Sequence, residues 1–556
     1  MSINRLRFVP LGGVTGVTKN MYLYELYEDQ NLIDILIIDC GIGFPHDKAL
    51  GVDFVIPDIS YLSDKKDKIR AVLLSHGHED HISALPYHYE DLGRPPIYAS
   101  NLTSAFVKNK FMETKRSVEV NKVDYKREYQ IGNFKVEFIH LTHSIPDTTH
   151  IFLKTPVGNI YHGPDYKFDL TPPYGDPPDF QKILRLSGEG VLCLLSDCLG
   201  VDREGATLSE RVVGQTFEDV MRTTKGKFIM STFSSNISRI RQCVEAAIKF
   251  NRKIVFMGRS MRENTRIASE IGYLPIPQNL LAKEEQVMRL PPNKVCLIVA
   301  GSQGQYNSAL SKLATNQNKS VKIKQGDKII FSSDPIPGNE GEVYSVIEDI
   351  IRRGAEVVYS DNEEELHASG HGNKEDLKFL VRFTKPKFFI PIGGTIRHQQ
   401  GYQQMATELG YSKDVVHLLD EGDTVVFEKN TARKGISVET KDIYVDAYGI
   451  GDVGNVVLSD RTALSTDGIV FVAVVLDNKL QLVIPPKFAT RGFVFEKGET
   501  ELFKRADAVI SGILKPKADK VINIGNLKRE TAVRLEDFFF KEKGRRPLIV
   551  VEVLQV

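Results

Sequence analysis

The chain lacks several features that would direct it to a membrane, to an oxidising compartment or to a polyanion through overall charge. In its 556 residues, Lys+Arg and Asp+Glu number 72 each. The net charge is therefore zero and gives no global sign of nucleic-acid binding. No apolar run approaches the roughly 18 residues of a membrane span. The five cysteines form no C-x-x-C pair, and the first residues contain no apolar signal segment. These absences predict a cytoplasmic protein with reduced thiols and no membrane partner.

The length and the order of patterns predict an α/β chain of several domains, because one hydrophobic core does not extend over so many residues. Short strands separated by glycine come first and suit one sheet of a sandwich. Apolar strands that alternate with amphipathic helices follow, and this pattern is typical of a doubly wound parallel sheet. We expect a first domain in two parts (1–208 and 354–432), an insert (209–353), a linker (433–448) and a C-terminal α+β module (449–556).

A cluster of histidines directly follows the apolar run AVLL. His76, His78, Asp80 and His81 lie together where a predicted strand gives way to a loop, in a chain with only 13 histidines. Imidazole and carboxylate are ligands that suit zinc or manganese. The alternative is a polar loop that is rich in histidine by chance. The H-x-H-x-D-H pattern is the signature of the metallo-β-lactamase superfamily, and it predicts a binuclear metal hydrolase without naming a substrate.

Further ligand candidates occur at the ends of other predicted strands. His143 lies in HLTHSIPDTTH, and Asp165 follows a Gly-Pro turn, where its carboxylate could bridge two metals or simply cap the turn. Asp39 ends a buried strand before a glycine. Its carboxylate could orient a metal-binding histidine, although an ordinary turn aspartate is an equal alternative. These positions predict that several strand ends converge on one site.

The predicted insert contains a local excess of positive charge between residues 221 and 270. Such a run is usually a solvated helix face, but beside a hydrolytic site it also suits an anionic polymer. Ser234, Ser235 and Asn236 come between a strand and a helix, where free N–H groups could hold a phosphate or where one residue could act as a plain N-cap. A later loop, HASGHG, brings His367, Ser369 and His371 together.

Several longer motifs carry a resemblance to a known family. They include DCGIGFP, LSHGHEDHISALPY, THSIPD, DYKFDLTP, TFSSNISRI, GSQGQ, SSDPIPGNE, HASGHG and VDAYGIGDVGN. With these motifs the chain resembles ribonuclease J, of the β-CASP group within the metallo-β-lactamase superfamily, over nearly its whole length. The resemblance implies an αββα sandwich with an inserted β-CASP domain and a small C-terminal domain. It further implies a zinc-dependent ribonuclease that acts on single-stranded RNA.

The resemblance also implies roles for individual residues. His76, His78 and His143 would hold one zinc ion, Asp80 and His81 would hold the other, and Asp165 would bridge the two ions. Asp80 and His371 would serve catalysis, with His371 protonating the leaving 3′-oxygen. RNA oxygens, including those of a 5′-monophosphate, would be bound by Ser234, Ser235, Asn236, His367, Ala368, Ser369, Gly370 and His371. Some relatives hold a structural cation, which here would involve Gly51, Asp53 and Asp446. The C-terminal module would support a homodimer or homotetramer, or assembly with a paralogue.

One departure from the family pattern concerns the second metal. After the strand FFIPI the family pattern has His-Gly-Glu, whereas this chain has Gly393, Gly394 and Thr395. The distal histidine ligand is therefore missing, and His398 is the remaining candidate to replace it. With an incomplete ligand set, the second site would bind more weakly and would favour Mn²⁺ or Mg²⁺.

Three functions follow from these observations. The leading interpretation is a ribonuclease with 5′-to-3′ exonuclease and also endonuclease action in RNA processing and decay. The second is a catalytically weakened RNA-binding subunit that pairs with an active paralogue, and the change at Gly393 motivates it. The third, a hydrolase of DNA or of small molecules, is disfavoured in its small-molecule form by the basic insert.

Overall fold

The computed structural model describes residues 3–45, 49–336, 338–359, 366, 368–446, 449–493, 499–514 and 523–556. Two compact units divide the chain. The first comprises residues 1–43 and 56–442, and the second comprises residues 44–55 and 443–556. The second unit thus includes an early segment that the sequence analysis did not group with the C-terminal module.

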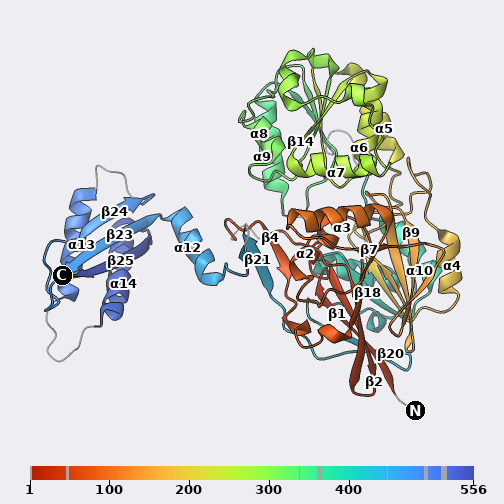
Figure 1. Ribbon diagram of the computed structural model, residues 1–556, viewed down its shortest axis with the longest axis horizontal. Helices are drawn as coiled ribbons and strands as arrows, with labels where there is room; N and C mark the ends of the chain where they lie inside the picture. The colour runs from red at the N-terminus through yellow and green to blue at the C-terminus, as the bar shows by residue number, and fades with distance from the viewer. Residues whose placement is uncertain are drawn as a thin grey trace. The chain divides into compact units, whose positions relative to one another are not determined.

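Two mixed sheets face each other in the first unit (Figure 1). The larger sheet has the strand order β20-β19-β1-β2-β3-β5-β6-β7 and the smaller has the order β18-β12-β11-β10-β9-β8. The larger sheet consists of β1 (Asn4–Gly12), β2 (Met21–Glu28), β3 (Asn31–Ile38), β5 (Ile69–Leu73), β6 (Ile97–Ala99), β7 (Val120–Lys122), β19 (Val425–Glu428) and β20 (Thr431–Lys434). The smaller consists of β8 (Glu128–Ile131), β9 (Phe134–Leu141), β10 (Thr148–Thr155), β11 (Gly158–Gly163), β12 (Cys193–Asp197) and β18 (Phe388–Ile392).

The main hydrophobic core lies between these two sheets. Phe8 and Leu36 from the larger sheet, and Phe138 and Leu195 from the smaller one, belong to the same buried cluster. Burial of such side chains contributes roughly 1.5–3 kcal/mol each, which makes this layer the principal source of stability. A second cluster packs helices onto the outer face of the smaller sheet. These helices are α4 (Phe180–Ser187), α10 (Lys374–Thr384) and α11 (Ile396–Glu408).

Helices α1 (Glu79–Ile82), α2 (Leu85–His88) and α3 (Asn101–Glu113) lie beside the larger sheet and complete the expected α-β-β-α layering. Helix α3 contacts β6 and β7. The short helices α1 and α2 directly follow β5, and α1 contains part of the histidine motif. The motif is therefore held at the point where a strand of the larger sheet ends and the helical layer begins.

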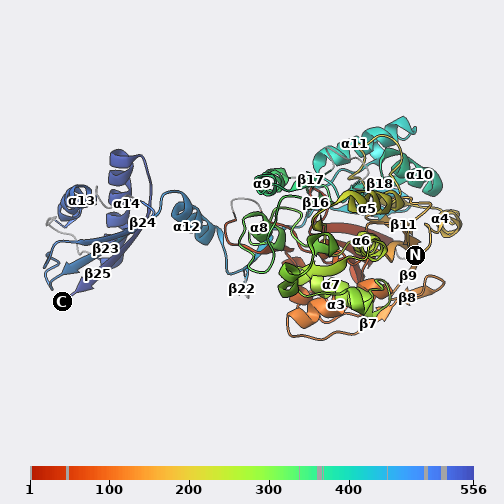
Figure 2. The ribbon, with the colours of Figure 1, turned by 90° about the horizontal axis from the view of Figure 1, so that it is seen from above.

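The insert is a five-stranded parallel sheet with the order β14-β15-β13-β16-β17. Its strands are β13 (Phe228–Ser231), β14 (Lys253–Met257), β15 (Val295–Val299), β16 (Lys328–Phe331) and β17 (Glu356–Val358). The helices are α5 (Arg211–Thr223), α6 (Ile237–Lys249), α7 (Arg259–Glu270), α8 (Ala309–Ala314) and α9 (Glu340–Ile351). Helices α8 and α9 pack on one face of the sheet, while α5 packs against α6. Figure 2 shows the insert from above.

Two expected boundaries differ from the structure. The insert continues to β17 rather than ending at 353, because β17 pairs with β16 and completes the parallel sheet. The linker expected from 433 begins later, because Arg433 and Lys434 belong to β20 and pair with β19. Both differences arise because the pairing partner of a short strand is not visible in the strand's own sequence.

The second unit has its own core. Strands β23 (Ile469–Leu476), β24 (Lys487–Arg491) and β25 (Leu548–Gln555) form a sheet with the order β24-β23-β25. Helices α13 (Glu499–Ile513) and α14 (Ile524–Lys543) contribute side chains to one buried cluster with these strands. Helix α12 (Asn455–Thr466) precedes them, and β21 (Asp442–Asp446) forms a small sheet with β22 (Gly449–Ile450) and β4 (Phe54–Pro57). This is the α+β composition expected of the C-terminal module.

Candidate metal centre

The predicted ligands come together where several strands end. The histidine motif follows β5, His143 follows β9, Asp165 follows β11 and Asp197 ends β12. Gly41 permits close packing at this point, because a Cβ there would lie 1.6 Å from the carbonyl oxygen of Asp80. Glycine before the motif is therefore a steric requirement of the site.

The first group of potential ligands consists of His76, His78, His143 and Asp165, whose ligand atoms all lie within 4.8 Å of one another. Nε2 of His76 and Nε2 of His143 lie 3.8 and 3.7 Å from Oδ2 of Asp165. His143 is oriented by a hydrogen bond of 2.7 Å between its Nδ1 and the carbonyl oxygen of Gly370. That bond leaves Nε2 facing the group, as metal-binding histidines require.

Burial keeps the imidazoles of this group neutral. It lowers the pKa of His76 and of His78 well below the ordinary value. The nearness of other histidines disfavours a further proton on either ring, and Asp165 acts in the opposite direction. Burial likewise lowers the pKa of His143 to about 3, although Asp165 acts in the opposite direction. Neutral imidazoles with free lone pairs are the form that binds metal, so this group fits a zinc ion.

The second group consists of Asp80, His81 and Asp165. Nε2 of His81 lies 3.4 Å from Oδ2 of Asp165 and 3.6 Å from Oδ2 of Asp80. Its other ring nitrogen, Nδ1, is 2.7 Å from Oδ2 of Asp39. Asp39 thus orients a candidate ligand, the role considered for it from the sequence. The amide of Asn20, which the sequence analysis did not single out, lies 3.1 Å from Nε2 of His81.

Charge is concentrated in this second group in the absence of metal. Burial raises the pKa of Asp80 to about 6, with the negative charge of Asp165 acting in the same direction. Burial alone would lower the pKa of His81, but Asp165, Asp80 and Asp39 outweigh it and raise that pKa well above the ordinary value. Carboxylates therefore surround His81 on this side of the centre, as they do at cation sites.

Position 393 is the point where the second group is incomplete. A Cβ on Gly393 would lie 3.5 Å from Oδ1 of Asp197 and 3.7 Å from Oδ1 of Asp165, in ordinary contact. A longer side chain at this position would thus extend directly beside the second group. The glycine has a φ of +69°, and its N–H donates to the carbonyl oxygen of Gly13 over 2.7 Å.

The suggestion that His398 replaces the missing ligand is wrong. His398 lies in the first turn of α11, where its Nδ1 accepts a hydrogen bond from the N–H of Thr395 over 3.2 Å. Its Nε2 lies 3.7 Å from the carboxylate of Asp202. Among the described residues, no group of potential metal ligands includes His398. The helix cap directs the ring away from the second group, because Thr395 and His398 form a reciprocal capping box.

His371 lies at the edge of the centre and pairs with Asp197. Its Nδ1 is 2.7 Å from Oδ2 of Asp197, and its Nε2 is 3.9 Å from Oδ2 of Asp165. Burial lowers the pKa of His371, but the carboxylates of Asp197 and Asp165 outweigh burial and raise it to about 9. Asp197 is a residue of this centre that was not predicted from the sequence. Its position after LLS was the available signal for a functional role.

The segments expected to bind phosphate form local hydrogen bonds. Asn236 caps α6 through its side chain, which accepts from the N–H of Arg239 over 3.1 Å, and Ser235 is buried beside it. The N–H of His371 donates to Oγ of Ser369 over 3.1 Å. Ser234 accepts a hydrogen bond from Asn264 over 3.2 Å. His367, also expected here, lies outside the described residues.

Arg239 connects the insert to the segment that bears Ala368. The fully buried guanidinium contacts both carboxylate oxygens of Glu210 at 2.7 and 2.8 Å and donates to the carbonyl oxygen of Ala368 over 2.8 Å. Glu210 also pairs with Lys167, two residues after Asp165, at 3.4 Å. The sequence analysis counted Arg239 only as part of the positive charge of the insert. Its structural role is to tie two phosphate-binding candidates to the metal centre.

A cavity of about 1120 Å³ adjoins this centre. His143 and Glu210 line it, together with Arg241, Tyr174 and Tyr273 from outside the ligand groups. The Arg241 guanidinium lies 3.9 Å from the centroid of the Tyr174 ring. Its size and its mixed aromatic and charged lining suit a polymer with bases and phosphates.

The residues considered for a structural cation are arranged differently. The carboxylate of Asp446 forms an ion pair of 2.5 Å with the guanidinium of Arg461, which also donates to the carbonyl oxygen of Leu50 over 2.9 Å. A Cβ on Gly51 would lie 2.9 Å from the same guanidinium. In the part of the chain that the structure describes, Asp53 and Asp446 belong to no group of potential metal ligands. An arginine cation neutralises Asp446 instead.

Two further expectations concern thiols and membranes. All five cysteines are buried free thiols, as the odd number and the spacing indicated. No helix within the described ranges is long and apolar enough to span a bilayer.

Comparison with protein families gives four matches along the chain. Residues 35–174 match the beta-lactamase superfamily domain, and residues 361–418 match the Zn-dependent metallo-hydrolase RNA specificity domain. Residues 225–350 match the beta-CASP domain of ribonuclease J, and residues 456–556 match the ribonuclease J C-terminal domain. The four matches follow the order of the structural parts.

Curated proteins match over the full chain. Ribonuclease J 1 of Streptococcus pyogenes is 35% identical, with 99% of this chain and 98% of that protein covered. Ribonuclease J2 of Bacillus subtilis is 34% identical with 99% of both covered, and ribonuclease J 2 of Staphylococcus aureus is 32% identical with 99% and 98% covered. A crystal structure of a protein of unknown function from Enterococcus faecalis covers 76% of this chain with a TM-score of 0.51. At 14% identity, that last similarity supports the fold alone.

Proposed function

The chain belongs to the ribonuclease J family of metal-dependent ribonucleases, and on this basis we propose that it hydrolyses single-stranded RNA from 5′-monophosphorylated ends. The observation that carries the proposal is the convergence of two groups of ligand atoms on Asp165, beside a cavity of about 1120 Å³. The proposed action is 5′-to-3′ exonuclease cleavage, with endonuclease cleavage as a further activity, in RNA processing and decay.

We propose zinc as the metal. His76, His78 and His143 would hold the first ion, Asp80 and His81 would hold the second, and Asp165 would touch both. The donor chemistry fits, because the first group offers neutral imidazoles and the second is rich in carboxylate. Bound zinc would supply a water of lowered pKa and would stabilise negative charge on the phosphate. Mn²⁺ or Mg²⁺ is the alternative at the second position.

The protein's own residues would place the RNA and manage one proton. Ser234, Ser235 and Asn236 precede α6. The N–H groups of Ile237 and Arg239 are already bonded to the Ser235 carbonyl and the Asn236 side chain, so a phosphate there would be held by the serine hydroxyls and the positive end of the helix. Ala368, Ser369 and Gly370 would contact the RNA from the neighbouring loop. Arg239 holds this loop in place by donating to the carbonyl oxygen of Ala368. His371 carries a proton at neutral pH because its pKa is raised to about 9, and it would deliver that proton to the leaving 3′-oxygen. Asp197 would hold the ring in position for this transfer.

A second candidate function is favoured by Gly393. Without a side chain there, the second group offers only Asp80, His81 and Asp165. A weakly held second ion would leave the chain as an RNA-binding subunit with reduced catalysis, assembled with an active paralogue. In this case RNA binding would be retained while cleavage by the purified chain would be slow.

Cleavage and metal content together separate the two functions. The substrate is 5′-monophosphorylated single-stranded RNA with added Zn²⁺ or Mn²⁺, and the control is the Asp80→Ala/His81→Ala variant. The enzyme proposal expects cleavage by the wild-type protein alone and a metal content near two ions per chain. Equal signals from the two proteins would refute it. A single tightly bound ion with intact RNA binding would favour the weakened subunit.

The proposal includes an assembly and a location. The second unit is the proposed oligomerisation module, giving a homodimer, a homotetramer or a complex with a paralogue. The proposed location is the cytoplasm, where reduced glutathione would keep the five free thiols reduced.

A further inference from the structure

A second cavity, of about 650 Å³, lies on the outer face of the larger sheet. Four adjacent strands place its residues by register. Arg433 on β20 pairs with Val426 on β19, Val426 pairs with Arg7 on β1, and Arg5 on β1 pairs with Tyr27 on β2. Because alternate residues of a strand share a face, Arg5 and Arg7 lie on the side opposite the core residues Leu6 and Phe8. Three guanidiniums are thus gathered on one surface.

Two of these guanidiniums form no ion pair with a carboxylate of the described residues. Arg7 is satisfied internally, because it contacts Glu25 at 3.3 Å and donates to the Tyr61 hydroxyl over 2.8 Å and to the carbonyl oxygen of Ile436 over 2.6 Å. Arg5 donates only to neutral acceptors, the carbonyl oxygen of Asp29 and Oε1 of Gln30, at 2.6 and 3.3 Å. Arg433 is exposed and has no hydrogen-bond or ion-pair partner in the described portion of the chain. The part of the cavity that contains Arg5 and Arg433 therefore suits an anion.

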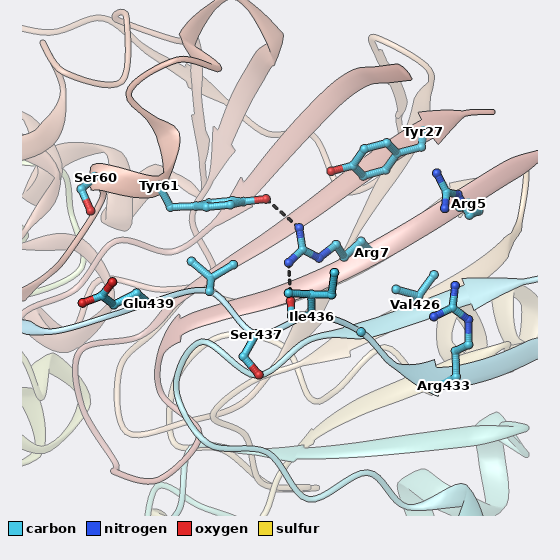
Figure 3. A pocket seen from close by; sticks show the side chains of 12 residues that line it. Arg5, Arg7, Tyr27, Ser60, Tyr61, Val426, Arg433, Ile436, Ser437 and Glu439 are labelled. Atoms are coloured by element: carbon cyan, nitrogen blue, oxygen red, sulfur yellow. Dashed lines mark hydrogen bonds between the residues drawn. The ribbon is translucent and has the colours of Figure 1, made fainter. Parts of the chain in front are cut away.

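The rest of the cavity has a different chemistry. Its middle has apolar surface from Val426, Ile436 and Val438, and Ile436 is 87% exposed. The Arg7 guanidinium also lies there, between the Tyr61 hydroxyl and the carbonyl oxygen of Ile436. Ser437 and Glu439 offer hydroxyl and carboxylate oxygens. Figure 3 shows Arg5 and Arg433 at one end and Glu439 at the other, with Tyr61 and Ile436 between them. The lining is thus cationic at one end, apolar and aromatic around the paired Arg7 in the middle, and rich in acceptors at the other end.

We infer that this cavity binds one nucleotide of single-stranded RNA outside the metal centre. Arg5 and Arg433 would contact the phosphate, since guanidiniums match phosphate oxygens and are always charged. The base would lie in the middle, against Tyr61, Ile436 and the flat guanidinium of Arg7, and Ser437 or Glu439 would accept hydrogen bonds from its amino or imino N–H groups. The volume is that of a site for one such group.

The site would act on long RNA only. Gly13 marks the metal-centre end of this strand, because its carbonyl oxygen accepts from the N–H of Gly393. Strand β1 and the residue after it place Arg7 about 20 Å from Gly13, at ~3.4 Å per residue. An RNA held in the metal centre would have to extend over several nucleotides to reach the cavity. The inference rests on the proposed function, because it takes RNA as the substrate.

The test compares Arg433→Glu with Lys434→Glu. Both reverse one charge on β20, but successive residues of a strand face opposite sides, so only Arg433 faces the cavity. Binding is measured in the Asp80→Ala/His81→Ala background, so that the RNA is not cleaved, with fluorescent RNAs of about 5 and about 30 nucleotides. We expect Arg433→Glu to weaken the long RNA about tenfold, as for a lost charged hydrogen bond, and the short RNA little. Lys434→Glu should change both much less.

A second variant tests the apolar part without changing charge. Ile436→Ala removes an exposed side chain, so the fold should persist, and we expect severalfold weaker binding of the long RNA only. The inference is overturned if Arg433→Glu and Lys434→Glu weaken binding equally, if short and long RNAs respond alike, or if free nucleoside monophosphates bind the cavity and RNA does not. Cleavage by the parent protein with unchanged binding by Arg433→Glu would refute this site and leave the proposed function standing. If the parent protein does not cleave RNA but the variants show the expected binding pattern, this site stands and the proposed function fails.

Discussion

At the scale of single residues, Gly393 lies where the second group of ligands is open. A side chain there would be directed past Asp165 and Asp197, and its Cβ would make only ordinary contacts. The backbone has a φ of +69°, which non-glycine residues adopt at a cost of about 1 kcal/mol, and histidine is among the residues that tolerate it best.

Gly393→His should therefore raise the metal content of the purified protein towards two ions per chain and strengthen Mn²⁺-supported RNA cleavage. The measurement is elemental analysis after dialysis, together with the cleavage rate. Gly393→Ala is the matched control, because it has the same backbone cost without an imidazole. Equal metal content in the two variants would show that position 393 does not reach the second ion.

His371 should make the stability of the metal-free protein depend on pH. Its pKa is raised from 6.5 to about 9 in the folded state, so its stabilising contribution is complete below pH 6.5 and is lost as the pH rises through 9. The side chain is only 22% exposed, and the upper limit of the contribution is about 3 kcal/mol.

His371→Gln should flatten the loss of stability between pH 6.5 and pH 9, as followed by urea denaturation in the presence of a chelator. His88→Gln is the control, because burial lowers the pKa of His88 to about 4 and that group does not titrate in this window. Parallel stability curves for wild type and His371→Gln would contradict the assignment.

At the scale of structural elements, one buried arginine connects α6, the start of α5 and the segment around Ala368. Arg239 is fully buried and forms a two-oxygen contact with Glu210, which Lys167 approaches from the other side. Removal of one member of a buried ion pair leaves an uncompensated charge and generally costs 3–5 kcal/mol. Because Lys167 remains near Glu210, the lower part of that range applies.

Arg239→Met should destabilise the protein by about 3 kcal/mol in urea denaturation and should lower RNA cleavage by displacing the Ala368 carbonyl. Arg241→Met, on the same helix, removes a partly exposed pair with Glu245 and the contact with the Tyr174 ring, and should cost about 1 kcal/mol. Addition of Glu210→Gln to Arg239→Met should recover part of the loss. A similar cost for the two single variants would argue against a buried network at this position.

At the scale of the whole molecule, the chain consists of two units with separate cores. The first contains both sheets of the sandwich and the insert, and the groups of potential metal ligands found among the described residues all lie in it. The second has its own sheet and two helices around one buried cluster. Residues 44–55 belong to this second unit, where Ala49 and Val52 pack against Val453.

Deletion of residues 449–556 should preserve the metal content of the remaining chain and abolish its assembly into dimers or tetramers. The reason is that the metal centre and its supporting network lie wholly in the first unit. Light scattering coupled to gel filtration measures the mass, and elemental analysis measures the metal. Unchanged oligomers after the deletion would place the assembly surface in the first unit.

The sequence alone determined the chemistry of the site and the order of the parts. H-x-H-x-D-H, the strand-end positions of His143 and Asp165, and the alternation of strands and helices in the insert are local patterns, and local patterns persist in the linear chain. The absence of a distal histidine at Gly393 was also visible there. Family motifs then supplied the substrate class.

Only the tertiary structure decided which groups meet. It directed His398 into a helix cap, paired Asp197 with His371, assigned β17 to the insert and neutralised Asp446 with Arg461. It also gathered Arg5, Arg7 and Arg433 on one face of the sheet. Apart from the local cap of His398, these contacts join residues distant in the sequence, and a side chain's partner depends on strand register and helix capping, which spacing in the chain does not specify.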